Sequence, residues 1–338
     1  MFFTPMYRES CERSGANDMN SRPEVSVIIP CFNSSSTIQR AVTSVLDQEG
    51  VHTEIILVDD GSTDNSVKLA KSVAGDRVTV RQLAGPSGTG IARNKGLERS
   101  TGTWIQFLDA DDSLEPCKLK KQLAVSENAD IVISGWNLYS NNQLVEKQFP
   151  HKLASVQDKL EVLLKENRIH SGAPLIRRAL VEKIGGFNEE LYHEDWEFWI
   201  NLFASKPRIV FLPGYLSNYF RTTASKSWDT RKRLVEDIRL LEFLQGQREY
   251  EAYSQTIDKE LRKKRIDTFV AYWIAGDKAE ANKQLAQLEE LKPVERAIVL
   301  LTRTGLVSRL VSGGLGPKKS MRILAGLIDR IGLRKNTH

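Results

Sequence analysis

The sequence predicts an α/β protein with a mixed, mostly parallel sheet flanked by helices, followed by a C-terminal helical extension. Between residues 24 and 135, apolar strand-like runs alternate with helix-like stretches. The runs are almost continuously apolar, which is typical of strands that are covered on both faces. From residue 231 the pattern changes to amphipathic helices rich in Lys, Glu and Leu. A chain of 338 residues suffices for one large domain with an appendage.

The individual elements follow from short apolar runs and from apolar residues at helical spacing. Five strands are expected in the first part of the chain, at 25–29, 54–58, 78–81, 104–108 and 131–134. The helices expected between them span 37–48, 66–72, 91–99 and 115–126. In the first of these helices, Ile38, Ala41, Val42 and Val45 fall on one face. Such an alternation builds a sheet with helices on both sides.

The remaining segments have a different texture. Residues 1–23 are polar and aperiodic, and we expect a flexible arm there. After residue 151 the pattern predicts helices at 156–166, 178–184 and 195–204, a strand at 208–212, and a series of helices over 231–291.

Charge and cysteine content exclude several classes of protein. The net charge is +5, but residues 296–338 alone carry nine Lys/Arg and one Asp, so the rest of the chain is slightly acidic. The basic character therefore describes a tail, and we expect no nucleic-acid partner. The three cysteines form no C-x-x-C pair, so a zinc site is not indicated. No apolar run reaches the ~20 residues of a membrane span, and no signal peptide is evident, which favours a cytoplasmic protein.

Acidic side chains follow two of the predicted strands, and a polar turn follows a third. The first strand ends in Pro-Cys-Phe-Asn, the second in Asp59-Asp60-Gly-Ser-Thr-Asp, and the fourth in Asp109-Ala-Asp111-Asp. The carboxyl ends of parallel strands meet at one edge of the sheet, where ligands bind. Several carboxylates on one edge repel each other unless a cation intervenes, and Mg²⁺ takes one or two carboxylates together with substrate phosphates. Asp109 and Asp111 therefore predict a metal site for a diphosphate. Each motif alone has a simpler interpretation as a turn or a helix N-cap.

A second acidic group lies at 193–197, where His-Glu-Asp-Trp-Glu follows a Gly-Gly-Phe turn and opens a helix. Such carboxylates are often only partners of the helix dipole. If the diphosphate carries a sugar that is transferred, however, one carboxylate is needed to accept the proton of the attacking hydroxyl. We expect Asp195 to be this general base, Glu194 to help hold the acceptor, and Trp196 either to stack on a sugar or to pack in the core.

These motifs together resemble the family 2 inverting glycosyltransferases of the GT-A fold. The resemblance rests on VSVIIPCFN (25–33), IILVDDGSTD (55–64), GIARNKG (90–96) and FLDADD (107–112), and extends through IGGFNE (184–189) and the Glu-Asp-Trp at 194–196. It implies a catalytic domain over 24–230, with a nucleotide-sugar-binding half at 24–135 and an acceptor half at 136–230. Residues 231–338 would then be a helical extension with the basic tail.

The resemblance also implies roles for individual residues. It implies that a nucleoside diphosphate sugar, most often a UDP-sugar, lies against Pro30, Phe32, Asn33, Asp59, Asp60, Arg93, Asp109, Ala110 and Asp111. Asp111, with Asp109 beside it, would bind Mg²⁺ or Mn²⁺, and Arg221 would approach the diphosphate. The acceptor would be a glycan or lipid-linked glycan in cell-surface polysaccharide synthesis, with inversion at the anomeric carbon.

Two other functions stay open at this point. A nucleotidyltransferase of related fold shares the metal-bound diphosphate, although no basic triphosphate loop follows the first strand. A non-catalytic sugar-nucleotide or glycan-binding protein would need no base. The tail at 296–338 has two interpretations, an interfacial membrane anchor that would make the protein peripheral, or a helical subdomain or oligomer contact.

Overall fold

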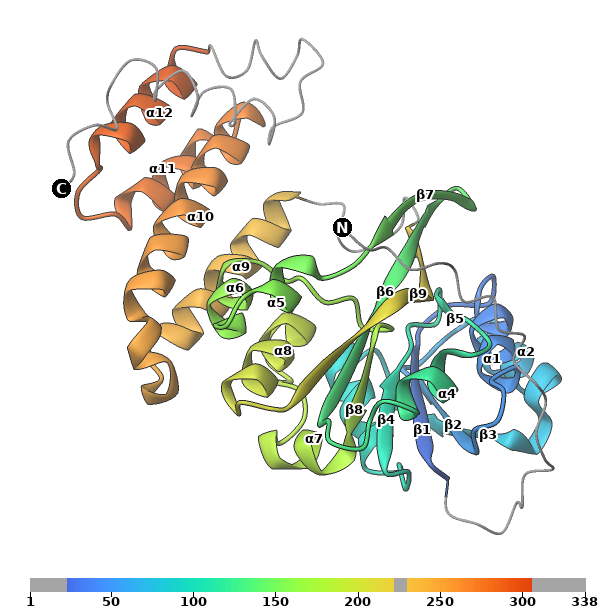
Figure 1. The fold of residues 1–338 in the computed structure, drawn as a ribbon. Coiled ribbons are helices and arrows are strands. Elements are labelled where there is room, and N and C mark those ends of the chain that lie inside the picture. Colours follow the sequence, from blue (N-terminus) through green and yellow to red (C-terminus); the bar gives the residue numbers. More distant parts are fainter. Residues whose placement is uncertain (1–22, 222–229, 306–338) are drawn as a thin grey trace. The chain divides into compact units, whose positions relative to one another are not determined.

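The computed structural model describes residues 23–221 and 230–305. The chain divides into two compact units, residues 1–223 and 224–338. The predicted arm at 1–22 and most of the basic tail, 306–338, lie outside the described residues. All the residues that the sequence marks as functional, up to Arg221, belong to the first unit, whose ribbon runs from blue to yellow in Figure 1.

The first unit is built on one mixed sheet, and the predicted fold class is confirmed. Its strands run in the order β3-β2-β1-β4-β8-β6-β9-β5, and β7 pairs with β6. The first four strands are parallel, β8 is antiparallel to both of its neighbours, and β6 and β9 are again parallel. The strands are β1 Val25–Cys31, β2 Thr53–Asp59, β3 Val78–Gln82, β4 Trp104–Phe107, β5 Ser113–Leu114, β6 Ile131–Ser140, β7 Gln143–Gln148, β8 Pro174–Arg177 and β9 Ile209–Arg221.

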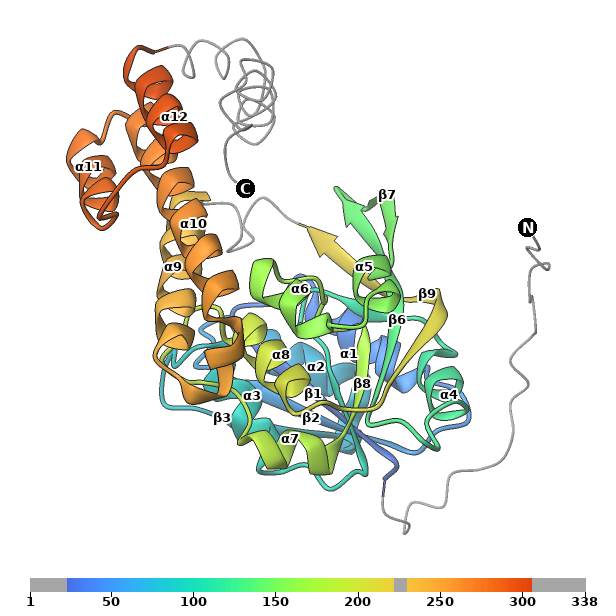
Figure 2. The same ribbon diagram turned by 60° about the vertical axis from the view of Figure 1, so that its left-hand side comes forward.

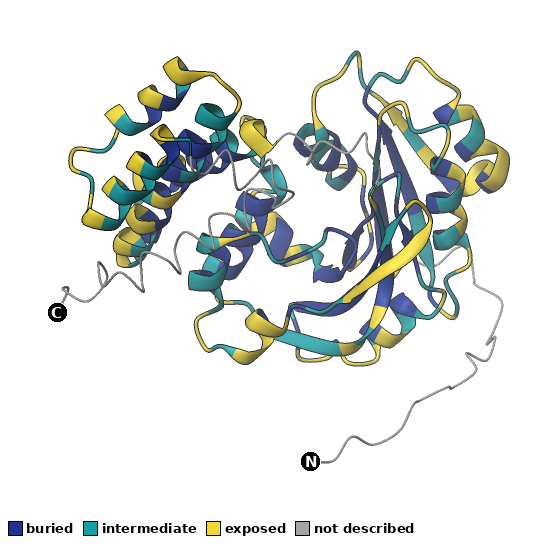
Figure 3. Ribbon diagram, turned by 90° about the horizontal axis from the view of Figure 1, so that it is seen from above, coloured by how far each residue is buried: buried dark blue, intermediate teal, exposed yellow. Residues whose placement is uncertain are grey.

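Helices cover the sheet because successive residues of each strand face opposite sides and both sets are apolar. On one side, Val27, Ile29 and Leu57 pack in a core with Ile38 and Val42 of α1. On the other side, Ile56 and Val58 pack against Ala92 of α3. Central strands such as β1 and β4 are accordingly buried, whereas β7 and the outer faces of the helices are exposed (Figure 3). The helices of this unit are α1 Ile38–Leu46, α2 Ser66–Ala74, α3 Thr89–Leu97, α4 Lys118–Leu123, α5 His151–Ser155, α6 Lys159–Lys165, α7 Arg178–Ile184 and α8 Glu194–Ala204.

Several elements differ from the sequence-based expectation. The helix predicted at 115–126 is shortened to α4, and the strand predicted at 208–212 continues as β9 to Arg221. Strands β5, β7 and β8 and helix α5 are not expected from the sequence pattern. The extension of β9 depends on pairing with β6 across two register shifts, next to Gly214 with a φ of 124°. A bulge of this kind leaves no regular alternation in the sequence to detect.

The parallel arrangement brings the ends of the first strands to one edge of the sheet. Cys31 at the end of β1 lies opposite Asp59 at the end of β2, and the Asp60 N–H donates to the Cys31 carbonyl at 2.8 Å. The Leu108 N–H, just after β4, donates to the Ile28 carbonyl of β1 at 3.0 Å. The acidic motifs that follow β2 and β4 therefore flank the end of β1.

Helix α3 lies close to β1, and Gly96 makes this approach feasible. A Cβ at Gly96 would lie 2.3 Å from Cγ2 of Ile28, which is fully buried. We expect Gly96→Ala to lower the free energy of unfolding, because overpacking costs about 1–3 kcal/mol. That cost exceeds the gain of at most about 1 kcal/mol in helix propensity. Urea unfolding of the two proteins measures the difference.

The matched control for this substitution is Gly85→Ala. A Cβ at Gly85 meets nothing within 4 Å, and its φ lies outside the left-handed region. We expect the midpoint of urea unfolding to stay nearly unchanged in this variant. A Gly96→Ala protein as stable as the wild type would show that α3 does not press on β1 as the structure has it.

The second unit is helical, with its own small core. Its elements are α9 Thr230–Gln245, η3 Arg248–Tyr253, α10 Ser254–Ile274, α11 Lys278–Ala286 and α12 Pro293–Arg303 (Figure 2). Phe269 and Val270 of α10 pack with Ala281 of α11 and Val299 of α12. In the described part of the chain, no helix combines the length and the apolar character that crossing a membrane requires.

Candidate functional site

The loops after β1 and β2 are tied to each other by side chains that the sequence marks as nucleotide-binding. Asn33 has a φ of 47°, a conformation that Asn tolerates better than most residues. Its Oδ1 accepts the Thr63 N–H at 2.9 Å, and its own N–H donates to Ser62 Oγ at 2.9 Å. Asn33 thus fixes the shape of the edge. Phe32, beside it, is 49% exposed and Pro30 is half-buried, so the Phe32 ring is open to a ligand.

Both carboxylates of the Asp59-Asp60 pair are used within the chain. Asp59 is buried and its Oδ1 accepts the Ser62 N–H at 3.2 Å. The two oxygens of Asp60 accept the N–H groups of Ser87 at 2.7 Å and Gly88 at 2.8 Å. Asp60 therefore holds the loop before α3 against the end of β2. Contact of either carboxylate with a nucleotide base stays a prediction.

Arg93 on α3 joins the two acidic motifs of the sequence. Its side chain is almost fully buried, and its guanidinium donates to Asp109 Oδ1 at 2.7 Å and to Glu194 Oε1 at 3.0 Å. Burial lowers the pKa of Arg93, but the carboxylates of Asp109, Glu194 and Asp195 together raise it. The Arg93 guanidinium thereby holds the loop after β4 beside the start of α8, although these segments are far apart in the chain.

A glycine makes room for this junction. A Cβ at Gly90, in the first turn of α3, would lie 3.2 Å from both Cβ and Cγ of Glu194. The start of α8 therefore packs directly on the first turn of α3, and Arg93 lies one turn further along the same helix. The sequence marks Gly90 only as part of a motif and gives no sign of this contact.

Asp195 lies in the first turn of α8, where the helix dipole favours a negative charge. Its Oδ1 accepts the Trp196 N–H at 2.7 Å, and its Oδ2 accepts from Nδ2 of Asn167 at 3.0 Å. For Trp196 the sequence leaves two interpretations, stacking on a sugar and packing in the core. The residue is 3% exposed and its indole N–H donates to the Leu163 carbonyl at 2.6 Å. The structure therefore corrects the substrate-binding interpretation in favour of core packing, because burial leaves no face of the ring open to a sugar.

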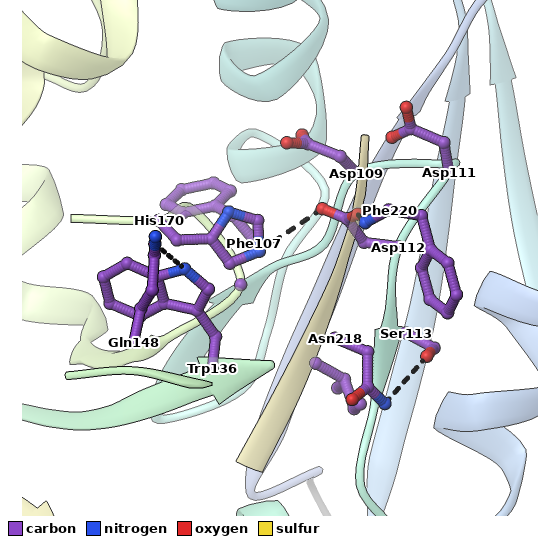
Figure 4. Close-up of polar contacts among 12 residues, drawn as sticks. Phe107, Asp109, Asp111, Asp112, Ser113, Trp136, Gln148, His170, Asn218 and Phe220 are labelled. Carbon is purple, nitrogen blue, oxygen red and sulfur yellow. Dashed lines mark hydrogen bonds and ion pairs between the residues drawn. The ribbon is translucent and has the colours of Figure 1, made fainter. Parts of the chain in front are cut away.

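The loop after β4, residues 109–112, is called the acidic loop below. Asp109 and Asp111 turn their carboxylates to the same side of it (Figure 4). Burial, and then the neighbouring Asp109, raise the pKa of Asp111 to about 6. Ala110 between them is buried. Arg40 of α1 donates to the Asp111 carbonyl and stacks on the Phe220 ring, with 3.6 Å between the guanidinium carbon and the ring centroid.

Asp112, the last residue of the acidic loop, faces away from the other two carboxylates (Figure 4). Its Oδ1 accepts the Phe220 N–H of β9 at 2.9 Å, and its Oδ2 lies 3.3 Å from Nε2 of His170. Burial raises the pKa of Asp112 well above its usual value and lowers the pKa of His170 to about 4. Burial thus disfavours the charged form of both groups where they meet.

The acidic loop fits a hard divalent cation that also binds a ligand. The donors are carboxylate oxygens, and in the described residues Asp111 makes no ion pair that would neutralise it. Among those residues, no group of three or more His, Cys, Asp or Glu side chains is arranged to hold a metal. A cation bound by one or two carboxylates and completed by phosphate oxygens agrees with both observations.

The structure brings together most of the predicted site residues and adds some that the sequence does not indicate. Arg221 ends β9, with its guanidinium carbon 6.0 Å from the centroid of the Tyr219 ring. The added residues are Arg40, Asn167 and His170. Arg40 and His170 contact the acidic loop and Asn167 contacts Asp195 of α8, each from an element that carries no recognisable motif, so only the tertiary structure identifies them.

Comparisons with known proteins point to one family. The family model described as glycosyl transferase family 2 matches residues 26–185. An uncharacterized glycosyltransferase of Haemophilus influenzae is 29% identical over 59% of this chain and 79% of its own length. A putative teichuronic acid biosynthesis glycosyltransferase, TuaG of Bacillus subtilis, is 38% identical over 39% of this chain. The chain spans 54% of the length of that second relative.

Solved structures show the same fold. S. aureus TarS, residues 1–349, in complex with UDP-GlcNAc has a TM-score of 0.61 at 21% identity, covering 86% of this chain and 92% of that one. The mannosyltransferase PcManGT from Pyrobaculum calidifontis, in complex with GDP-Man and Mn²⁺, has a TM-score of 0.56 at 16% identity, covering 98% of this chain and 92% of that one.

Proposed function

The chain belongs to glycosyltransferase family 2, and on that premise we propose that it transfers a sugar from a UDP-sugar to an acceptor hydroxyl by metal-assisted single displacement, with inversion. Residues 24–135 would bind the donor and 136–230 the acceptor. The observation that carries the proposal is the fork of Arg93, whose guanidinium binds Asp109 and Glu194. This fork supports a single site in which the acidic loop and Asp195 act on the same substrate.

Asp195 would act as the general base. Two of its lone-pair positions are occupied by the Trp196 N–H and by Asn167. A carboxylate has about four such positions, which leaves the others for the acceptor hydroxyl. As the oxygen of that hydroxyl attacks the anomeric carbon, Asp195 takes its proton, and the bond to the diphosphate breaks from the opposite face. A single displacement of this kind inverts the anomeric configuration.

Asp111, with Asp109 beside it, would hold Mg²⁺ or Mn²⁺. The bound cation supplies charge neutralisation for the departing diphosphate. The Mn²⁺ in the structure of PcManGT supports a divalent ion in this fold. Arg221 at the end of β9 would add a second cation on the diphosphate side, and Phe32, which is exposed, would contact the nucleotide.

The donor and acceptor classes are proposed from the relatives. TarS is described with UDP-GlcNAc, which supports UDP as the carrier. TuaG is named for teichuronic acid biosynthesis, which supports a glycan acceptor in polysaccharide synthesis. The cytoplasmic location expected from the sequence is part of the same proposal, and a membrane contact through 296–338 stays a prediction because most of that tail lies outside the described residues.

Thermal unfolding with a panel of nucleotides tests the proposal. We expect UDP and one or more UDP-sugars to raise Tm in the presence of Mn²⁺, and to do so much less after EDTA treatment. A ligand at about 100 times its Kd stabilises the folded state by about 2.7 kcal/mol. For a chain of 338 residues, with about 2.1 cal/mol/K of unfolding entropy per residue, the rise in Tm is roughly 4 °C. No rise with any nucleotide would contradict the proposal.

Asp111→Asn tests the part of this effect that depends on the metal. The amide keeps the shape of the side chain but has no charge for the cation, so we expect the Mn²⁺-dependent rise in Tm to be lost. Asp76→Asn, in η1 Gly75–Arg77, is the matched control, because Asp76 is exposed and outside the site. An Asp111→Asn protein with the full Mn²⁺ response would place the cation elsewhere.

A further inference from the structure

One loop of the first unit contacts both acidic parts of the site. Residues 166–173, called the α6–β8 loop below, connect the end of α6 to the start of β8. Nδ2 of Asn167 in this loop donates to Asp195, at the start of α8. His170, three residues later, lies against Asp112, at the end of the acidic loop. A single short segment thus spans the two groups that the proposed reaction brings together.

The amide of Asn167 has only one orientation that suits its surroundings. Its Oδ1 accepts the Ile169 N–H at 3.1 Å, so its Nδ2 is the atom that faces Asp195 Oδ2 at 3.0 Å. A flipped amide would place an oxygen against the carboxylate and lose the bond to Ile169. Ile169 is buried, which holds this turn of the loop in place. Asn167 therefore directs a donor at one oxygen of Asp195 and limits the rotation of the carboxylate.

His170 is fixed as firmly on the other side. Its ring is stacked on Tyr219 of β9, with 4.9 Å between centroids, and lies near Trp136 (Figure 4). Gly172 leaves room for it, because a Cβ there would lie 3.1 Å from His170 Nε2. The other carboxylate oxygen of Asp112 accepts a hydrogen bond from the Phe220 N–H. His170 thus joins the acidic loop to β9, just before Arg221.

The backbone of the α6–β8 loop is anchored in the sheet. Gln106 of β4 donates to the Gly172 carbonyl at 3.1 Å, and Gln122 of α4 donates to the Ala173 carbonyl at 3.0 Å. Both glutamines are fully buried. Asn167 and His170 therefore project from a support that is itself held by buried hydrogen bonds, as positioning groups require.

We propose that the α6–β8 loop sets the spacing between the base and the donor-binding loop, with Asn167 positioning Asp195 and His170 positioning the acidic loop through Asp112. Both are positioning residues and neither touches substrate. The inference rests on the proposed function, since it assigns Asp195 and the acidic loop their roles from it. The alternative is that both side chains only satisfy buried polar groups.

The two residues are expected to affect different steps. Isothermal titration calorimetry with UDP in the presence of Mn²⁺ measures the Kd of the nucleotide, which reports on the donor-binding loop. We expect His170→Ala to weaken this binding roughly tenfold or more, in the range found for outer residues of metal sites. We expect Asn167→Ala to leave the Kd of UDP within about twofold of the wild type. Equal effects of the two variants, or the reverse order, would overturn the assignment.

The contact between Asn167 and Asp195 also predicts how kcat ranks among variants of Asn167. With a UDP-sugar that raises Tm, we expect Asn167→Ala to lower kcat roughly 10–100-fold with little change in the donor KM. Asn167→Asp has the same shape but faces Asp195 with a second carboxylate, so it should be slower still at pH 8. If Asn167 only fills space, the isosteric Asn167→Asp variant should lose less kcat than Asn167→Ala. Glu166→Gln, an exposed neighbour in the same loop, is the control with unchanged kcat.

Crystal structures of the Asn167→Ala and Glu166→Gln proteins decide the inference without any activity. We expect the Asp195 carboxylate to change its side-chain rotamer in the first protein and to keep it in the second, with the backbone of α8 unmoved. An unchanged Asp195 in Asn167→Ala would overturn the inference. If the wild type binds neither UDP nor any UDP-sugar, the proposed function fails, and these structures still show whether Asn167 orients Asp195.

Discussion

Asp195→Asn is expected to lower kcat for sugar transfer by roughly 10²–10⁴-fold, the range that general-base catalysis contributes. The amide has nearly the shape of the carboxylate but accepts no proton from the attacking hydroxyl. Because Asp195 would act on the acceptor, the Kd of UDP with Mn²⁺ should stay within about twofold of the wild type. Release of UDP from a UDP-sugar, followed with and without acceptor, measures the effect.

Two comparisons make the Asp195→Asn result specific. Asp277→Asn changes another carboxylate at a helix start, in the second unit, where Asp277 caps α11 by accepting the Glu280 N–H at 3.1 Å. Asn caps a helix about as well as Asp, so stability and kcat should be unchanged. An Asp195→Asn enzyme that keeps a tenth or more of kcat would exclude Asp195 as the base. A wild type that binds UDP-sugars without transferring or hydrolysing them would favour a binding protein instead.

Arg93→Met is expected to cost about 3 kcal/mol in the free energy of unfolding, measured by urea denaturation. Removing one partner of a buried ion pair leaves an uncompensated charge, at a cost of about 3–5 kcal/mol. Here Asp109 is 31% exposed and Glu194 15%, so water screens part of the loss and the lower end of that range applies. UDP binding should weaken as well, because Asp109 would no longer be held.

Two further variants separate charge from shape at Arg93. Arg93→Lys keeps the charge, but a single ammonium cannot bond both carboxylates in the same fork, so an intermediate loss is expected. Adding Glu194→Gln to Arg93→Met removes the charge of one of the two carboxylates that Arg93 binds. The double variant should therefore be less destabilised than the sum of the two single variants. Strict additivity would show that Arg93 and Glu194 are not coupled.

The first half of the fold can be predicted from the sequence because its physics is local. Strands β1 and β2 are built on apolar runs, at Val27–Ile29 and Ile55–Val58, and each is followed by residues suited to a turn. Their parallel order places the acidic motifs on one edge, which is why the sequence alone suffices to group Asp109 with Asp111. Helix α8, at Glu194–Ala204, likewise follows from its apolar spacing.

The second half depends on contacts that leave no local pattern. Strand β8 has only four residues, Pro174–Arg177, and β5 has two, Ser113–Leu114, so pairing and not sequence defines them. Asn167 lies in a polar loop, where an Asn is unremarkable until its amide is seen to face Asp195. For Trp196 the sequence leaves core packing and sugar stacking open, and only the hydrogen bond from its indole N–H to the Leu163 carbonyl of α6 decides for the core.

A crystal structure of the protein with UDP and Mn²⁺ would show whether the acidic loop and Asp195 form one site. We expect an anomalous peak for Mn²⁺ within coordination distance of the Asp111 carboxylate, with the diphosphate bound to the same ion. We also expect the Asp195 carboxylate to face the space beyond the diphosphate, where the sugar and the acceptor hydroxyl meet. Nucleotide or Mn²⁺ bound away from the acidic loop, or a diphosphate with Asp195 out of reach of its sugar side, would contradict a single site.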